Sequence, residues 1–184
     1  DLEQISSGLD MRNIGGRAGS IALRGVDFNP NSGASPAVDV YWNGVTLGAN
    51  ASGGIFQEMF DLQRVEVLRG PQGALQGRTS PAGALAIHTA QPDMEEVEGY
   101  VRTTFMDNSS NNTQFGISLP IIPGQLSVRV AGVYNDSEMS ELKNIHGGDV
   151  SNTQTEAGRI TVAWQPLETL SVELAYQYLE NDLS

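Results

Sequence analysis

Residues 60–92 decide the fold, and they read FDLQRVEVLRGPQGALQGRTSPAGALAIHTAQP. The part from Arg64 to Val67 alternates charged and apolar residues, which is typical of a strand with one buried face. Glycines follow at positions 70, 73, 77 and 83, and a second apolar run extends from Ala84 to Thr89. Because glycine permits sharp turns and close approach of neighbouring backbone, the stretch predicts two strands joined by a tightly turning segment.

The run RVEVLRGPQG at positions 64–73 resembles, almost letter for letter, a segment of the plug domain of TonB-dependent outer-membrane receptors. In that family the segment has the form ERIEVLRGPQGxLYGxxAxGGxINI. The chain departs from it at Gln76, where tyrosine is usual, and at Thr79-Ser80-Pro81, which replaces a polar-Ala-Gly pattern. The resemblance implies a mainly β protein. An α+β plug domain over residues 1–95, incomplete at its N-terminus, would precede the first antiparallel strands of a transmembrane β-barrel over residues 96–184.

The glycine-rich run does not match a phosphate-binding loop. The pattern G-x-x-x-x-G-K-[ST] is not met, because the spacing differs and Arg78 stands where lysine is needed. The pattern G-x-G-x-x-G is also absent. No long helix is expected after the run, so no helix N-terminus would receive an anion.

The composition argues against several other functions. The 184 residues include 10 Lys and Arg against 22 Asp and Glu, a net charge of -12, whereas nucleic acid is bound by clustered Lys and Arg. Cysteine is absent, which excludes disulfides and thiolate metal sites. His88 and His146 lie in different halves without a second ligand at metal spacing, so neither a metal nor a cofactor is expected. No catalytic triad or paired carboxylate motif indicates an enzyme.

A transmembrane helix is not expected, because no stretch of about 18 apolar residues occurs. This does not exclude a membrane, since transmembrane strands need only about 10 alternating residues each. The chain begins with the polar and acidic DLEQ, so no signal peptide is seen at this end.

The first half is expected to be irregular and glycine-rich, with short strands over residues 21–24, 38–42 and 45–47. Asn43-Gly44 between the last two is a strong signal for a tight hairpin turn. Residues 55–60 could form a short helical turn.

From Gly99 the alternation becomes strict, and it predicts five amphipathic strands. Their connections alternate between polar loops, around 107–112 and 136–154, and tight turns at 120–125 and 166–169, as in outer-membrane barrels. Aromatic residues lie toward the strand ends, where an interfacial girdle would need them: Tyr134, Trp164, Tyr176 and Tyr178.

The strand pattern alone also fits a soluble antiparallel sandwich with one wet face. The alternative function is therefore a soluble or surface-anchored β-rich binding module without transport. The plug motif directly upstream favours the barrel. Five strands cannot close a barrel, whereas transporters of the resembling family use about 22 around a plugged lumen. We therefore expect residues 96–184 to belong to a longer chain.

The resemblance also implies roles for individual residues. Loops at the top of the plug meet the ligand in the family, and the corresponding candidates here are Phe28, Asn29, Asn31, Asn50, Phe56 and Gln57. The alternative for each of these is ordinary turn chemistry. Charged plug residues hold the plug to the barrel wall, and the candidates are Arg24, Glu66 and Arg69. The alternative for the arginines is solvation at a strand end.

The function implied by the resemblance is active transport across the outer membrane of a Gram-negative bacterium. The resemblance favours a ferric siderophore as the nutrient over the other cargoes of the family, such as haem, cobalamin and oligosaccharides. The implied partners are TonB, through a TonB box that is not seen in this chain, the nutrient and outer-membrane lipid. No bond would be made or broken.

Overall fold

The computed structural model describes residues 9–13, 19–23, 25, 38–48, 59–70, 82–105, 110–138 and 152–183. The chain divides into two compact units, Asp1–Ala90 and Gln91–Ser184. The described residues form strands and no helix, and the predicted helical turn over 55–60 falls largely outside them. Within these ranges there is no helix long and apolar enough to cross a membrane. The plug boundary at residue 95 stays a prediction.

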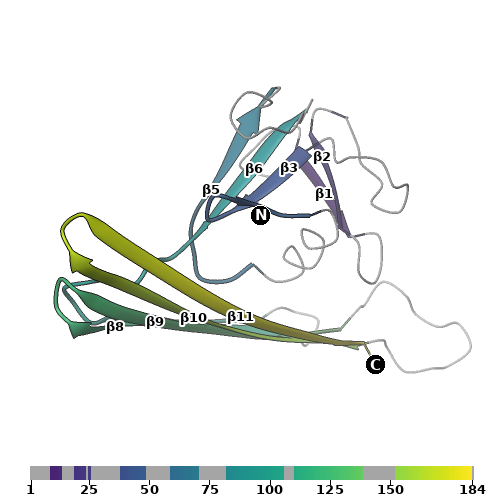
Figure 1. Cartoon of the computed structure of the whole chain (residues 1–184). Coiled ribbons are helices and arrows are strands. Elements are labelled where there is room, and N and C mark those ends of the chain that lie inside the picture. The colour runs from purple at the N-terminus through teal and green to yellow at the C-terminus, as the bar shows by residue number, and fades with distance from the viewer. Residues whose placement is uncertain are drawn as a thin grey trace, which may run out of the picture. The chain divides into compact units, whose positions relative to one another are not determined.

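The first unit contains a two-stranded and a four-stranded sheet (Figure 1). In the smaller sheet, β1 (Leu9–Asn13) pairs antiparallel with β2 (Gly19–Leu23). The larger sheet has the order β4-β3-β6-β5. Its strands are β3 (Val38–Trp42), β4 (Val45–Thr46), β5 (Leu62–Arg69) and β6 (Gly83–Thr89). Only β3 and β6 run parallel, and the other pairs of this sheet are antiparallel.

The predicted Asn43-Gly44 turn is confirmed, because both residues have positive φ, 48° and 81°, as a tight hairpin turn requires. The Asn43 side chain also fixes the turn to the end of β6. Its Nδ2 donates to Thr89 Oγ1 at 2.9 Å, and its Oδ1 accepts from the Thr89 N–H at 3.0 Å. The two ends of the parallel pair are thereby held together.

A small apolar core holds this unit together, built from Leu23, Val38, Val40, Ala82, Leu85 and Ile87. Gly83 lies at its edge with φ of 145°. A Cβ at this position would lie 2.3 Å from the Leu68 carbonyl oxygen and 2.7 Å from Leu23 Cδ2. This glycine therefore allows the close backbone approach that the glycine-rich stretch predicted.

The second unit is one antiparallel sheet of five long strands in the order β11-β10-β9-β8-β7, so each strand pairs with its sequence neighbours (Figure 1). The strands are β7 (Glu98–Phe105), β8 (Asn111–Ile122), β9 (Leu126–Glu138), β10 (Asn152–Leu167) and β11 (Leu170–Leu183). All five predicted strands are confirmed, and the tight turns between them are at 123–125 and 168–169.

The register of this sheet separates apolar from polar residues. One cross-strand row on the apolar face consists of Ile117, Val130, Ile160 and Tyr176. The adjacent row on the opposite face consists of Ser118, Arg129, Thr161 and Ala175. The apolar face is exposed, with Ile160 at 48% and Tyr176 at 70%, whereas Ser118, Arg129 and Thr161 are buried. This is the reverse of a water-soluble sheet and matches a barrel strand whose apolar side faces lipid.

Candidate functional site

Most of the predicted site residues lie outside the part of the chain that the structure describes. These are the ligand candidates Phe28, Asn29, Asn31, Asn50, Phe56 and Gln57, and the contact candidate Arg24. Their roles stay predictions. Gln76 and Thr79-Ser80-Pro81, where the chain departs from the family pattern, also lie outside the described residues.

Glu66 and Arg69 are on β5. Glu66 has a partner within its own sheet, because its Oε1 accepts from Arg64 Nε at 2.6 Å and lies 3.8 Å from His88 Nε2 on β6. The hydrogen bond from Arg64 is the main reason why the pKa of Glu66 is lowered. Both partners are exposed, so the pair adds little to stability. The proposed contact of Glu66 and Arg69 with the barrel wall stays a prediction.

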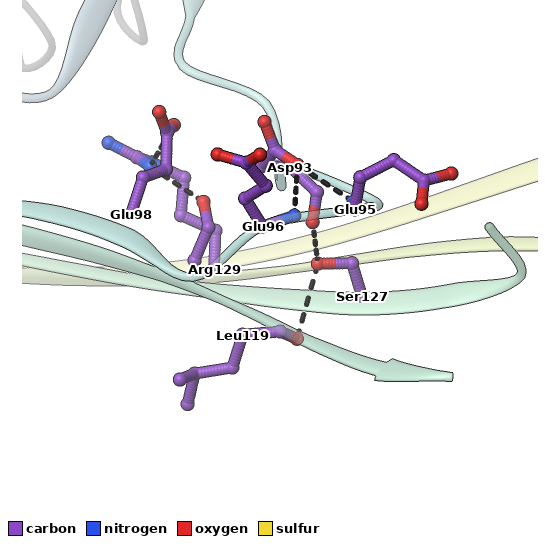
Figure 2. Close-up of polar contacts among 8 residues, drawn as sticks. Asp93, Glu95, Glu96, Glu98, Leu119, Ser127 and Arg129 are labelled. Atoms are coloured by element: carbon purple, nitrogen blue, oxygen red, sulfur yellow. Dashed lines mark hydrogen bonds and ion pairs between the residues drawn. The ribbon is translucent and has the colours of Figure 1, made fainter. Parts of the chain in front are cut away.

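The best-defined polar site is the segment 91–97, which precedes β7 and lies against the turn between β8 and β9 (Figure 2). Within this segment, the Asp93 side chain closes a turn. Its Oδ1 accepts from the backbone N–H groups of Glu95 and Glu96, both at 2.8 Å. The bond from Glu96 and then that from Glu95 lower the pKa of Asp93, because they stabilise its charged form.

Two consecutive carbonyls of this segment are hydrogen-bonded, one to β9 and the other to the β8–β9 turn. The Ser127 hydroxyl on β9 lies 2.5 Å from the Asp93 carbonyl oxygen and 3.2 Å from that of Leu119, so its single proton is shared between them. The Gly124 N–H donates to the Met94 carbonyl at 2.9 Å. Gly124 has φ of 70°, which glycine adopts without strain. Ser127 is fully buried, so few other partners are open to its hydroxyl.

The segment leads into a charged cross-strand row formed by Glu98, Ser118 and Arg129 on three adjacent strands. Arg129 Nη1 donates to Ser118 Oγ at 2.8 Å and lies 3.5 Å from Glu98 Oε1 (Figure 2). Only 5% of Arg129 is exposed, and a buried guanidinium needs such partners. We call segment 91–97 with Gly124, Ser127 and Arg129 the linker seat.

The linker seat can hold a chain in place, but it offers no nucleophile activated by a base. Among the described residues, no cluster of His, Asp and Glu could hold a metal ion. Sequence reasoning missed this site. The one available signal was Pro92-Asp93 ahead of two glutamates, since Asp after Pro favours a turn closed by its side chain.

Comparison with known proteins agrees with this architecture. Residues 1–84 match the family model of the TonB-dependent Receptor Plug Domain. The chain is homologous to the TonB-dependent receptors of the Gram-negative outer membrane, and the match covers their plug domain and strands of their barrel.

Individual relatives are receptors. The pesticin receptor of Yersinia pestis is 32% identical over 169 residues, which cover 90% of this chain and 24% of that protein. The crystal structure of the ferric yersiniabactin uptake receptor FyuA from Yersinia pestis superposes with a TM-score of 0.83 at 28% identity, covering 97% of this chain and 28% of that one. The pyoverdine receptor FpvA of Pseudomonas aeruginosa, at 17% identity and a TM-score of 0.76, shares the fold over 99% of this chain and 25% of its own.

The chain thus spans about a quarter of the length of the curated relatives that it matches. These relatives are described as receptors, and FyuA as an uptake receptor.

Proposed function

We propose that this chain works as part of an outer-membrane active transporter, which binds a ferric siderophore and imports it with energy supplied through TonB. The observation that carries the proposal is the continuity of a plug domain with a sheet whose apolar face is exposed, within one chain that resembles FyuA over 97% of its length. FyuA is described as a receptor for uptake of ferric yersiniabactin, which supports a ferric siderophore as the cargo.

In the proposed cycle, the siderophore binds at the top of the plug and in the outer loops. Phe28, Asn29, Asn31, Asn50, Phe56 and Gln57 are the proposed contacts, because aromatic rings and amides offer stacking and hydrogen bonds. TonB would then engage a TonB box, pull on the plug and open a path. Arg24, Glu66 and Arg69 are proposed to hold the plug to the barrel wall until that moment.

The linker seat suits this mechanism. A plug that is rearranged under tension needs a fixed end, and hydrogen bonds from Ser127 and Gly124 hold the chain just before β7. The barrel strands would stay paired while the plug changes.

The experiment that tests the proposal is uptake of radioactive iron by cells that lack their own siderophore receptors and express the full-length receptor. Ferric yersiniabactin and ferrioxamine B are the probes. Iron should accumulate from at least one probe in cells with TonB and should not accumulate in matched cells without TonB, although the probe still binds in both.

Two results would contradict the proposal. Accumulation of iron that is equal with and without TonB would exclude energised import. Absence of binding and uptake for ferric siderophores, with the receptor present in the outer membrane, would exclude this cargo class. A receptor with both Phe28→Ala and Phe56→Ala should bind the probe less well, while the amount of receptor in the outer membrane stays unchanged. This result would separate the ligand contacts from folding.

A further inference from the structure

Gly158 lies in the interior of β10, where neither the backbone conformation nor the packing of the protein requires a glycine. Its φ lies outside the left-handed region, so the backbone does not require glycine there. Glycine weakens a strand, because it loses more conformational freedom on folding and offers no side chain to pack. Such a glycine often marks a place where another group approaches the backbone closely.

The neighbouring glycine gives the contrast. Gly132 on β9 pairs directly with Gly158 in the register. A Cβ at Gly132 would lie 2.6 Å from Phe115 Cε1, so the phenyl ring of β8 already covers that position. A Cβ at Gly158 would have only the Ala131 carbonyl oxygen near it, at 3.9 Å. The space above Gly158 is therefore left open by the protein.

This open space is part of a groove of about 690 Å³ on the exposed apolar face of the sheet. Its walls are mainly aromatic and apolar: Phe115, Tyr134, Ile160, Tyr176 and Tyr178. The volume is within the range of about 300–1,000 Å³ that is typical of small-molecule sites. We call it the Gly158 groove.

One end of the groove is polar. Gln154 Nε2 donates to the Tyr134 hydroxyl at 3.1 Å, and the Tyr178 hydroxyl donates to Glu180. The other end continues past Ile160 into the apolar rows. The polar end lies where residues 139–151 connect β9 to β10, whereas the opposite end of β10 meets the two-residue turn 168–169. Because long connections face the outside in outer-membrane barrels, the polar end is the outer one.

We propose that the Gly158 groove binds one acyl chain of an outer-leaflet lipid, with the lipid headgroup at the polar end near Gln154. The groove lies on the exposed apolar face of the sheet. Because such a face contacts lipid in an outer-membrane barrel, the groove would be continuous with the lipid interface. An acyl chain is apolar and narrow enough to lie over a bare glycine, and tyrosines with apolar rings and polar tips suit the level where chain meets headgroup. The inference depends on the outer-membrane location and not on the nutrient transported.

The test uses the full-length receptor in vesicles of phosphatidylethanolamine and phosphatidylglycerol that contain a phospholipid with a photoreactive acyl chain. Crosslinks are mapped by mass spectrometry. In the unaltered receptor, labelling should be concentrated at Ile160, Tyr176 and their neighbours. Gly158→Leu fills the groove and should reduce labelling there to the level of the remaining apolar face.

The matched control is Val101→Phe, which adds bulk to the same cross-strand row on β7, where Val101 is 78% exposed. It should leave the concentrated labelling unchanged. Heat-modifiability gels verify that each variant is folded, and Gly158→Ala provides a smaller filling step if the leucine variant is not. Uniform labelling of the apolar face in the unaltered receptor would overturn the proposal. Concentrated labelling that survives Gly158→Leu, or a groove covered by a second receptor copy in crosslinked dimers, would also overturn it.

Discussion

Replacement of Ser127 by alanine tests whether the linker seat is held by the contacts described above. The hydroxyl is fully buried and bonds the carbonyls of Asp93 and Leu119. Its removal leaves the half-buried Asp93 carbonyl without this donor. An unsatisfied buried polar group costs about 1–3 kcal/mol, and the lower part of that range applies to a half-buried one. The same segment is bonded to the β8–β9 turn through the Gly124 N–H and the Met94 carbonyl. A local loss of about 1–2 kcal/mol raises the opened population roughly 5–30-fold.

Hydrogen exchange read by mass spectrometry on the full-length receptor measures this opening. The Gly124 amide is the reporter, because it is bonded to the carbonyl next to Asp93. Exchange of this amide should accelerate by the factor given above in Ser127→Ala. The control is Ser171→Ala, which removes an exposed hydroxyl from β11. Unchanged exchange at Gly124, or an equal rise in both variants, would refute the reasoning.

Three further predictions concern other parts of the structure. The pKa of Asp93 is lowered in the folded chain. The turn that Asp93 closes should therefore keep its stability down to the unfolded pKa of about 3.9, and lose it as the pH falls through the lower folded pKa. Hydrogen exchange measured against pH tests this, and the Asp93→Asn variant should not show the pH dependence. Gly83→Ala should destabilise the plug by about 1–3 kcal/mol or more, because Gly83 has a positive φ and its Cβ would lie 2.3 Å from a carbonyl oxygen. Limited proteolysis should therefore cleave this variant faster than the control Gly48→Ala, whose Cβ meets nothing within 4 Å. In detergent, Gly158→Ala should raise the stability of the folded receptor by about 0.5–1 kcal/mol. Gly132→Ala should lower that stability, because the new Cβ would lie 2.6 Å from an aromatic ring. Thermal unfolding followed by the heat-modifiable band compares the two variants, and equal shifts of their unfolding temperatures would contradict the packing described.

The sequence predicted the barrel strands well because their signal is local. Each strand alternates strictly, so apolar positions such as Val130 and Ile160 are assigned to one face without knowledge of their neighbours. The Asn43-Gly44 turn was predictable for the same reason, since its chemistry is contained in two residues.

Other features depend on partners distant in sequence and were not predicted. The pairing of β3 with β6 joins Val38 to Gly83, and β1 was not recognised at all. The linker seat was missed because two of its hydrogen bonds are accepted by backbone carbonyls, of Asp93 and Met94, which carry no signature in the sequence. The polar row of Ser118 and Arg129 looked like ordinary wet-face residues until the register placed them beside Glu98.

The linker seat also marks the point where the slack created by tension on the plug would end. If the plug were drawn out, residues 1–92 alone would span roughly 300 Å at about 3.3–3.6 Å per residue. Because Asp93 is bonded to Ser127 on β9 and Met94 to Gly124 in the β8–β9 turn, the load would first meet those hydrogen bonds and not the ones between β7 and β8. The pairing of β7 with β8 would then be shielded from the load on the plug, and the sheet would not be pulled apart from β7.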